Sequence, residues 1–153
     1  MTSFNFLLVD DEKPFIETLA HRLRKRGFTV DCSFSGAEAL NTLDNNSAID
    51  VVVIDIKMPG LDGIQTIKKL KGKHPLVEVI MLTCHSNIHS AVETIKFGAF
   101  DYLKPCDINH LISKAKQAVF RKKEREAKIF DIRIQPYITR QERDELISQV
   151  LEK

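Results

Sequence analysis

The stretch "VVVIDIKMPG", residues 51–60, joins a run of β-branched apolar residues to a carboxylate and a turn. The apolar residues 51–54 predict a strand that is covered on both faces, as in parallel sheets with helices on each side. Asp55 then stands where this strand leaves the sheet. In open α/β sheets, ligands bind in the crevice beyond the carboxyl ends of the strands. We therefore expect Asp55 to serve chemistry rather than packing.

Short apolar runs alternate with segments of helical period along most of the chain. Helices are expected to stop near Gly27, Gly72 and Gly98, and Asp107 is expected to cap the last one before the tail. This alternation implies a parallel sheet with right-handed crossovers, and the fold class that we predict is α/β: a doubly wound five-stranded parallel sheet of flavodoxin-like (βα)5 order with a C-terminal helical extension. The predicted strands are residues 4–9, 28–33, 51–55, 77–83 and 101–103.

Length and composition are those of one cytoplasmic domain with a small appendage. The chain has 153 residues, and 43% of them are hydrophobic, enough for a core. We find no signal-peptide pattern and no apolar run long enough to cross a bilayer, so we expect no membrane partner. The three cysteines, Cys32, Cys84 and Cys106, form no C-x-x-C pair, which argues against a disulfide framework or a zinc site.

Polar residues follow four of the five predicted strands. Asp10 and Asp11 end the first, Asp55 the third, Thr83 the fourth and Lys104 the fifth. Because all carboxyl ends of a parallel sheet lie on one edge, we expect these side chains to converge. Carboxylates so close together repel one another unless a cation neutralises them. Mg²⁺ fits, since it takes oxygen ligands and commonly acts together with phosphate oxygens.

These residues predict phosphoryl transfer. An ammonium and a hydroxyl are suited to contact phosphoryl oxygens, and Lys104 and Thr83 supply them. Asp55 is then left as the nucleophile, which gives an aspartyl phosphate.

Taken together, these residues resemble the receiver domain of two-component response regulators, the CheY-like family. The resemblance covers about residues 4–120, and the combination of motifs is far more specific than any one of them. We accordingly assign residues 1–122 to a receiver domain and 123–153 to an extended helix and a short amphipathic tail. The matching stretches are "LLVDDE" (7–12), "DIKMPGLDG" (55–63), "MLT" (81–83) and "GAFDYLKP" (98–105).

The resemblance implies a role for each matching position. Asp55 would accept phosphate from a sensor histidine kinase and also ligate Mg²⁺, which Asp11 and the backbone carbonyl of Lys57 would bind directly and Asp10 through water. Thr83 and Lys104 would bind the phosphoryl oxygens. Phosphorylation would then remodel the face made by the fourth helix, the fifth strand and the fifth helix, which reads out to a downstream protein. No enzymatic activity beyond the domain's own phosphorylation and dephosphorylation is implied.

Three further residues are candidates for modulating the site. Tyr102 corresponds to the family's switch aromatic, but it stands only two positions before Lys104, one fewer than the family pattern has. With period-two alternation, this changes the face that the aromatic takes relative to the lysine. Lys57 and His85 follow Asp55 and Thr83 by two positions, and we expect them to obstruct water and slow hydrolysis of the phosphate. By resemblance, the Lys104–Pro105 bond would be cis.

The residues at these positions disfavour a rival enzyme class and exclude a dinucleotide-binding fold. Haloacid-dehalogenase-like phosphatases also use a strand-end aspartate with Mg²⁺, but they need a second acid two residues later, where this chain has Lys57. A dinucleotide-binding fold needs glycines after the first strand, whereas residues 10–14 read "DDEKP".

The C-terminal part of the chain leaves alternatives open. Residues 114–128 carry seven basic and two acidic side chains, so an adaptor that binds nucleic acid or an acidic protein is one hypothesis. We favour a solvated helix end and expect no nucleic-acid binding, since no helix-turn-helix follows. A further hypothesis is that the chain is the N-terminal fragment of a larger regulator.

The tail itself predicts a short amphipathic helix. A capping box at Thr139 and Glu142 precedes an apolar stripe formed by Leu146, Ile147, Val150 and Leu151. We expect the stripe to pack against its own domain or, as we favour, against a second copy in a homodimer.

Overall fold

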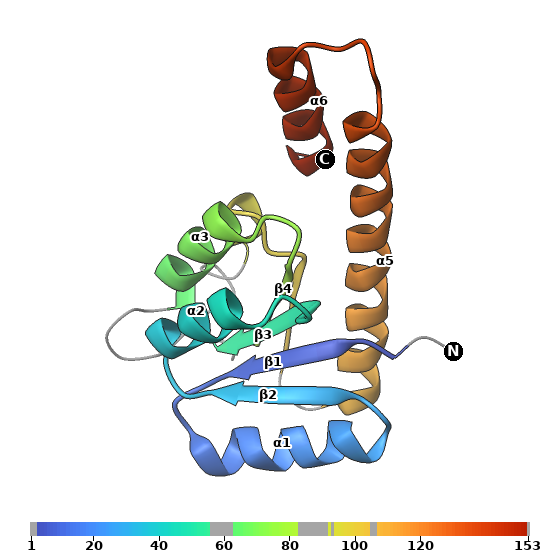
Figure 1. The fold of residues 1–153 in the computed structure, drawn as a ribbon. Helices are drawn as coiled ribbons and strands as arrows, with labels where there is room; N and C mark the ends of the chain where they lie inside the picture. The colour runs from blue at the N-terminus through green and yellow to red at the C-terminus, as the bar shows by residue number, and fades with distance from the viewer. Residues whose placement is uncertain (1–2, 56–62, 83–91, 93, 105–106, 153) are drawn as a thin grey trace.

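The computed structural model confirms the predicted doubly wound fold and describes residues 3–55, 63–82, 92, 94–104 and 107–152. Strands and helices alternate along the chain, and two helices follow the last strand (Figure 1). Most of the fourth predicted helix lies outside the described residues, of which 92 and 94–96 are helical. The elements are β1 Asn5–Val9, α1 Lys13–Lys25, β2 Thr29–Ser33, α2 Gly36–Asn45, β3 Val51–Asp55, α3 Gly63–Lys73, β4 Glu78–Leu82, β5 Asp101–Leu103, α5 Ile108–Arg133 and α6 Arg140–Glu152.

The five strands form one parallel sheet in the order β2-β1-β3-β4-β5. This is the flavodoxin-like order, in which the chain reverses its winding direction between β1 and β3. Val9 of β1 pairs with Ile54 of β3, so the residues that follow them leave the sheet side by side. Asp10 and Asp55 therefore stand at the point of reversal, where a ligand-binding crevice is expected.

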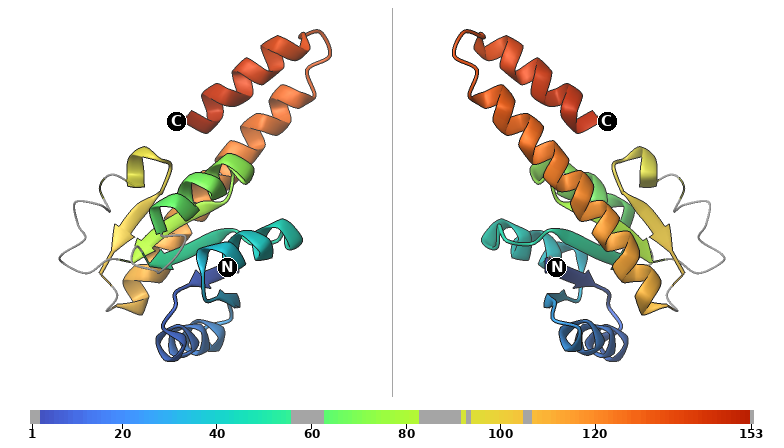
Figure 2. Two further views of the ribbon diagram at one scale, coloured as in Figure 1. Left: turned by 90° about the vertical axis from the view of Figure 1, so that its left-hand side faces the viewer. Right: turned by 90° about the vertical axis from the view of Figure 1, so that its right-hand side faces the viewer.

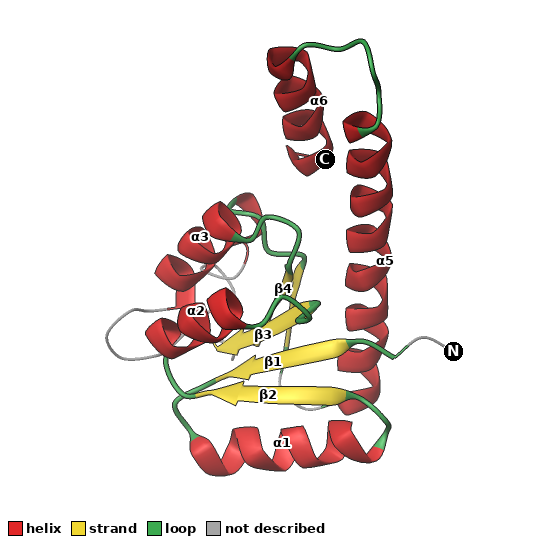
Figure 3. Ribbon diagram, viewed as in Figure 1, coloured by secondary structure: helices red, strands yellow, loops and turns green. Residues whose placement is uncertain are grey.

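Helices cover both faces of the sheet, as the apolar run in β3 predicted (Figure 3). Val51 and Val53 pack in the core under α1 and α5, whereas Val52 and Ile54 pack in the core under α2 and α3. All four side chains are buried. The continuous apolar run is thus explained by burial on both faces of a central strand.

The predicted strands that began with phenylalanine are shorter than expected. Phe4 and Phe28 are buried, but they precede β1 and β2 rather than joining their ladders. Together with Phe6 they form a cluster with ring centroids 5.0–5.4 Å apart. Their apolar character reflects this aromatic packing at the sheet's end, and no local pattern separates that from a strand position.

Helix α5 continues past the sheet as one unbroken helix, so the domain boundary that we placed at residues 122/123 falls inside it. Asp107 caps it as predicted, since its Oδ1 accepts hydrogen bonds from the backbone N–H groups of Asn109 and His110. The second half is not simply a solvated end, because Arg125, Ile129 and Ile132 are buried.

Helix α6 folds back along α5 as an antiparallel hairpin of the same chain (Figures 1 and 2). The predicted cap is present: the backbone N–H of Glu142 donates to Oγ1 of Thr139 at 3.1 Å. The apolar stripe of α6 is half-buried. The alternative that we gave for the tail was packing in cis against its own domain, over the fourth and fifth helices. The structure shows α6 along α5, and the homodimer stays a prediction. Within the described residues, no helix is long and apolar enough to cross a membrane.

Candidate functional site

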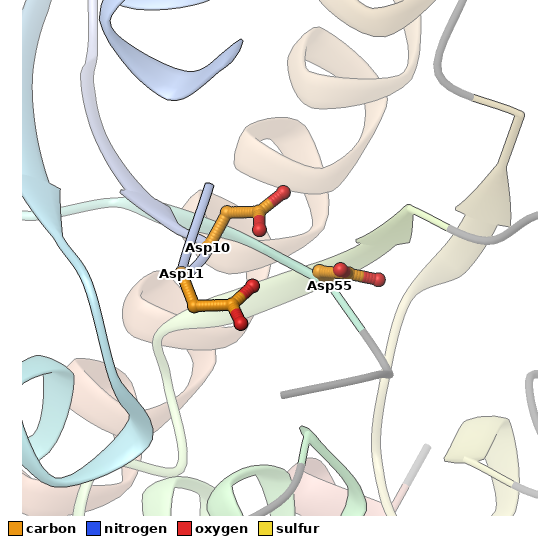
Figure 4. A group of neighbouring side chains, drawn as sticks. All are labelled: Asp10, Asp11 and Asp55. Carbon is orange, nitrogen blue, oxygen red and sulfur yellow. The ribbon is translucent and has the colours of Figure 1, made fainter. Parts of the chain in front are cut away.

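Three carboxylates meet where β1 and β3 end (Figure 4). Asp10 and Asp11 follow β1, and Asp55 is the last residue of β3. One oxygen from each lies within 4.8 Å of the others. The sheet register brings them together, because Val9 pairs with Ile54 and the next residues are Asp10 and Asp55. The predicted convergence of these carboxylates is therefore present, although 45 positions of sequence separate Asp10 from Asp55.

Asp10 is the most enclosed of the three, with 6% of its surface exposed. The pKa of its carboxyl is raised to about 7: burial is the largest cause, and the charges of Asp55 and Asp11 add to it against the lowering effect of the Glu12 N–H. That N–H donates to Oδ1 of Asp10 at 3.0 Å, while the N–H of Asp10 donates to the carbonyl of Ser33. The hydrogen bond thus holds the Asp10 side chain in place, while burial and the neighbouring carboxylates disfavour its ionised form.

The donor set fits a hard divalent cation. Its ligands are carboxylate oxygens, which Mg²⁺ and Ca²⁺ prefer, and the described cluster contains no thiolate or imidazole. Asp10 is buried, Asp55 half-buried and Asp11 exposed, so the cluster runs from the core to solvent. A cation bound there relieves the repulsion that raises the pKa of Asp10.

The other predicted site residues divide into two groups. Lys104 directly follows Leu103 of β5, whose partner in β4 is Leu82, and it lies exposed at the same edge of the sheet as Asp55. Tyr102 is half-buried and packs on the α2 and α3 side, whereas Leu103 packs on the α1 and α5 side. Thr83, Lys57 and His85 lie outside the described residues, as does the Lys104–Pro105 bond.

A small apolar cleft beside Lys104 was not predicted from the sequence. It has a volume of about 90 Å³ and lies between α1 and α5, where Phe15 and Leu19 face Leu103 and Ile108. The signal for it is visible in retrospect: the apolar stripe of α1 is wider than the part that the core covers, since Phe15 and Leu19 are only half-buried.

The model of the response regulator receiver domain family matches residues 6–116. The chain belongs to this family. The match includes the three carboxylates, Lys104 and every strand except the first residue of β1. The resemblance first seen in the motifs is therefore confirmed over most of the chain.

Known relatives agree with this assignment. The chain is 38% identical over 113 residues to the DNA-binding transcriptional regulator NtrC of Escherichia coli K12. This match covers 73% of this chain and 24% of that protein. A receiver domain protein from Clostridium thermocellum superposes with a TM-score of 0.75 at 34% identity, over 78% of this chain and 97% of that one.

The C-terminal hairpin also has a structural counterpart. NtrX from Brucella abortus matches 97% of this chain with a TM-score of 0.78 at 29% identity, and this chain covers 34% of it. The chain therefore spans about a quarter to a third of the length of these regulators.

Proposed function

We propose that Asp55 accepts a phosphoryl group from the phosphohistidine of a sensor histidine kinase. A carboxylate oxygen of Asp55 attacks phosphorus as the bond from phosphorus to the histidine nitrogen breaks, and an acyl phosphate forms on Asp55. The observation that carries this proposal is the group of three carboxylates at the ends of β1 and β3, within 4.8 Å of one another. The reaction is confined to the domain's own phosphorylation and dephosphorylation.

Mg²⁺ is the cation that we assign to this cluster, held by Asp10, Asp11, Asp55 and the Lys57 carbonyl. When bound, it neutralises charge on the carboxylates and on the incoming phosphoryl oxygens. The hydrogen bond from the Glu12 N–H to Oδ1 of Asp10 would hold this carboxylate in position for the cation. We assign Lys104 and Thr83 to contacts with the phosphoryl oxygens, which would orient the phosphorus atom in line with the attacking oxygen of Asp55.

Phosphorylation is proposed to act on the face that contains residues 92–96, β5 and α5. Val92 and Ile95 are exposed apolar side chains on this face, and Tyr102 of β5 is half-buried next to it. If one arrangement of this face favours the phosphorylated form of Asp55 over the other arrangement, phosphorylation shifts the population toward it. A downstream protein or a further domain would recognise that arrangement in the cytoplasm, as befits relatives named as transcriptional regulators.

The test is the intact mass of the chain after incubation with acetyl phosphate, with and without Mg²⁺. We expect one phosphate, added only when the metal is present and lost in base as an acyl phosphate should be. Asp55→Asn should add none, while Asp44→Asn, a carboxylate on α2 outside the cluster, should be labelled normally. Normal labelling of Asp55→Asn would refute the mechanism.

A further inference from the structure

Three cations surround a buried carboxylate at the start of β4, the end of the strands opposite to Asp55. Glu78, the first residue of β4, is 0% exposed, and the Arg121 guanidinium binds its carboxylate with two nitrogens, Nη2 at 2.6 Å from Oε1. Lys71 Nζ lies 3.7 Å and Arg125 Nη1 3.9 Å from the same carboxylate. Three cations from α3 and α5 therefore share one negative charge.

Arg125 is the least satisfied member of this cluster. It is 7% exposed, and among the described residues its partner is Glu78 at 3.9 Å, beyond hydrogen-bond distance. By contrast, Lys71 donates to the carbonyls of Pro75 at 2.8 Å and Val77 at 2.9 Å. A buried guanidinium normally uses its several N–H donors, so Arg125 has hydrogen-bonding capacity left for a ligand.

The electrostatics of the cluster indicate an excess of positive charge. The pKa of Lys71 is lowered to about 8: burial is the largest cause, and the charges of Arg121 and Arg125 add to it against the attraction of Glu78. The pKa of Arg125 is likewise lowered by burial and by Arg121. An anion placed here would relieve this repulsion.

A cleft of about 540 Å³ opens over these cations. Its walls are residues 95–100, α5 and the end of α6, which descends along α5 toward the sheet (Figure 1). Lys96 and Glu152 are exposed charges on its lining, and Phe97 and Leu151 supply apolar surface. We call this cleft, lined by Arg121 and Arg125, the basic cleft.

We propose that the basic cleft binds the phosphate group of a small molecule of nucleotide size. Four cationic side chains, Lys71, Lys96, Arg121 and Arg125, face two carboxylates, Glu78 and Glu152, so the excess matches a phosphate dianion. Guanidinium groups suit the bidentate recognition of phosphate, and the cleft has the volume and the apolar surface typical of small-molecule sites.

Binding there would connect the C-terminal hairpin to the receiver domain. The ligand would contact α5, α6 and residues 95–100, the last of which adjoin the face that we assign to signal output. Any coupling between the basic cleft and Asp55 must be reciprocal, so the ligand would alter phosphorylation as much as phosphorylation alters its affinity.

The probe that we choose is adenosine 5′-monophosphate, with adenosine and inorganic phosphate as comparisons. The experiment uses the full chain carrying Asp55→Asn in EDTA, which removes metal-dependent anion binding at the phosphoacceptor site and so keeps this test independent of the proposed function. We expect saturable shifts of the backbone amides of residues 97–100 and 148–152 with the monophosphate, and weaker binding of adenosine, which lacks the phosphate.

Two exposed residues of the cleft provide variants with opposite expected effects. Lys96→Gln should weaken binding severalfold, and Glu152→Gln should strengthen it. Arg125→Gln should weaken it by roughly tenfold or more, the equivalent of losing one charge-assisted hydrogen bond. Lys128→Gln, a cation of α5 outside the cleft, is the matched control and should bind as the parent does.

The proposal is overturned if no saturable shift occurs, or if adenosine binds as tightly as the monophosphate. Equal weakening by Lys128→Gln and Lys96→Gln would show attraction to a basic surface rather than a site. Because Lys96 and Glu152 are exposed, their variants keep the test valid even if Arg125→Gln does not fold.

Discussion

At the scale of single residues, the acidic site combines conflicting requirements. Asp10 is buried among like charges, and its pKa is raised from 3.8 to about 7. A group of this kind favours the protonated form in the folded chain, so its ionisation works against folding. The site is thus arranged for a cation at the expense of the stability of the metal-free protein.

The first prediction concerns the pH dependence of that stability. Because the folded chain binds the Asp10 proton more tightly than the unfolded chain, metal-free stability should fall as pH rises from about 4 to about 7 and then level off. Asp10→Asn should flatten this part of the profile and raise metal-free stability near neutral pH. Urea denaturation in EDTA over this range measures both, and an unchanged slope in Asp10→Asn would contradict the assignment.

The second prediction concerns the cation. Mg²⁺ that binds only the folded chain should stabilise it, by about 2.7 kcal/mol at roughly a hundred times its dissociation constant. Asp11→Asn should lose most of this increment, since Asp11 is the exposed carboxylate of the cluster. Thermal melts with and without Mg²⁺ measure it, and Glu17→Gln on α1 serves as the control. Equal stabilisation of the parent chain and Asp11→Asn would exclude Asp11 as a ligand.

At the scale of secondary-structure elements, partly buried ion pairs connect α5 to the sheet. Arg121 reaches Glu78 at the start of β4, and Lys122 Nζ lies 2.7 Å from Asp50 Oδ1 just before β3. The aromatic ring of Phe100 lies under the Arg121 guanidinium, 4.8 Å from its centre. These contacts lie where α5 leaves the sheet, so they fix the direction of its projecting half.

The third prediction tests this attachment. Arg121→Met should destabilise the chain by about 3 kcal/mol, the low end of the range for breaking a buried pair, because Lys71 and Arg125 remain near Glu78. Lys73→Met removes a pair of similar length, Lys73 with Asp44 at 2.9 Å, but at the exposed surface, and should change little. Similar losses of unfolding free energy in both variants would count against a special role for Glu78.

At the scale of the whole molecule, the chain consists of a receiver domain and a helical hairpin. None of the residues of α6 is fully buried, whereas α5 has buried residues on both sides of its midpoint. Four large apolar side chains of α5 and of the connection to α6 are more than half exposed: Phe120, Phe130, Ile134 and Tyr137. Among the described residues, the large apolar side chains that are more than half exposed therefore all lie in α5 or just after it.

The fourth prediction concerns removal of α6. A chain that ends at Gln135 should be phosphorylated on Asp55 to the same extent, because the site and both cores remain. Amides around Ile129 and Ile132 should exchange faster, since these buried side chains belong to the projecting half that α6 accompanies. Hydrogen exchange measures this, and unchanged protection would show that α6 does not cover α5.

Sedimentation of the two chains tests the homodimer that we favoured from the apolar stripe. A mass that falls from dimer to monomer when residues 136–153 are removed would support it. Two monomers would show that the packing of α6 on its own α5 accounts for the stripe.

Local sequence patterns were sufficient to predict the architecture and the acidic part of the site. The apolar run at residues 51–54, the strand-end carboxylates and the caps at Asp107 and Thr139 are all encoded by neighbouring residues. In a parallel sheet every carboxyl end lies on one edge, so the order of elements already brings Asp10 near Asp55. That is why the acidic cluster was predictable without coordinates.

Only the tertiary structure decided which charges are buried. Glu78 and Arg121 are 43 positions apart, and each is an ordinary polar residue in its local pattern, yet Glu78 is fully buried and pairs with Arg121. The same holds for Arg125 under the basic cleft, for the raised pKa of Asp10 and for the folding back of α6. Burial depends on which elements cover a residue, and desolvation and Coulomb energies follow from that cover rather than from sequence neighbours.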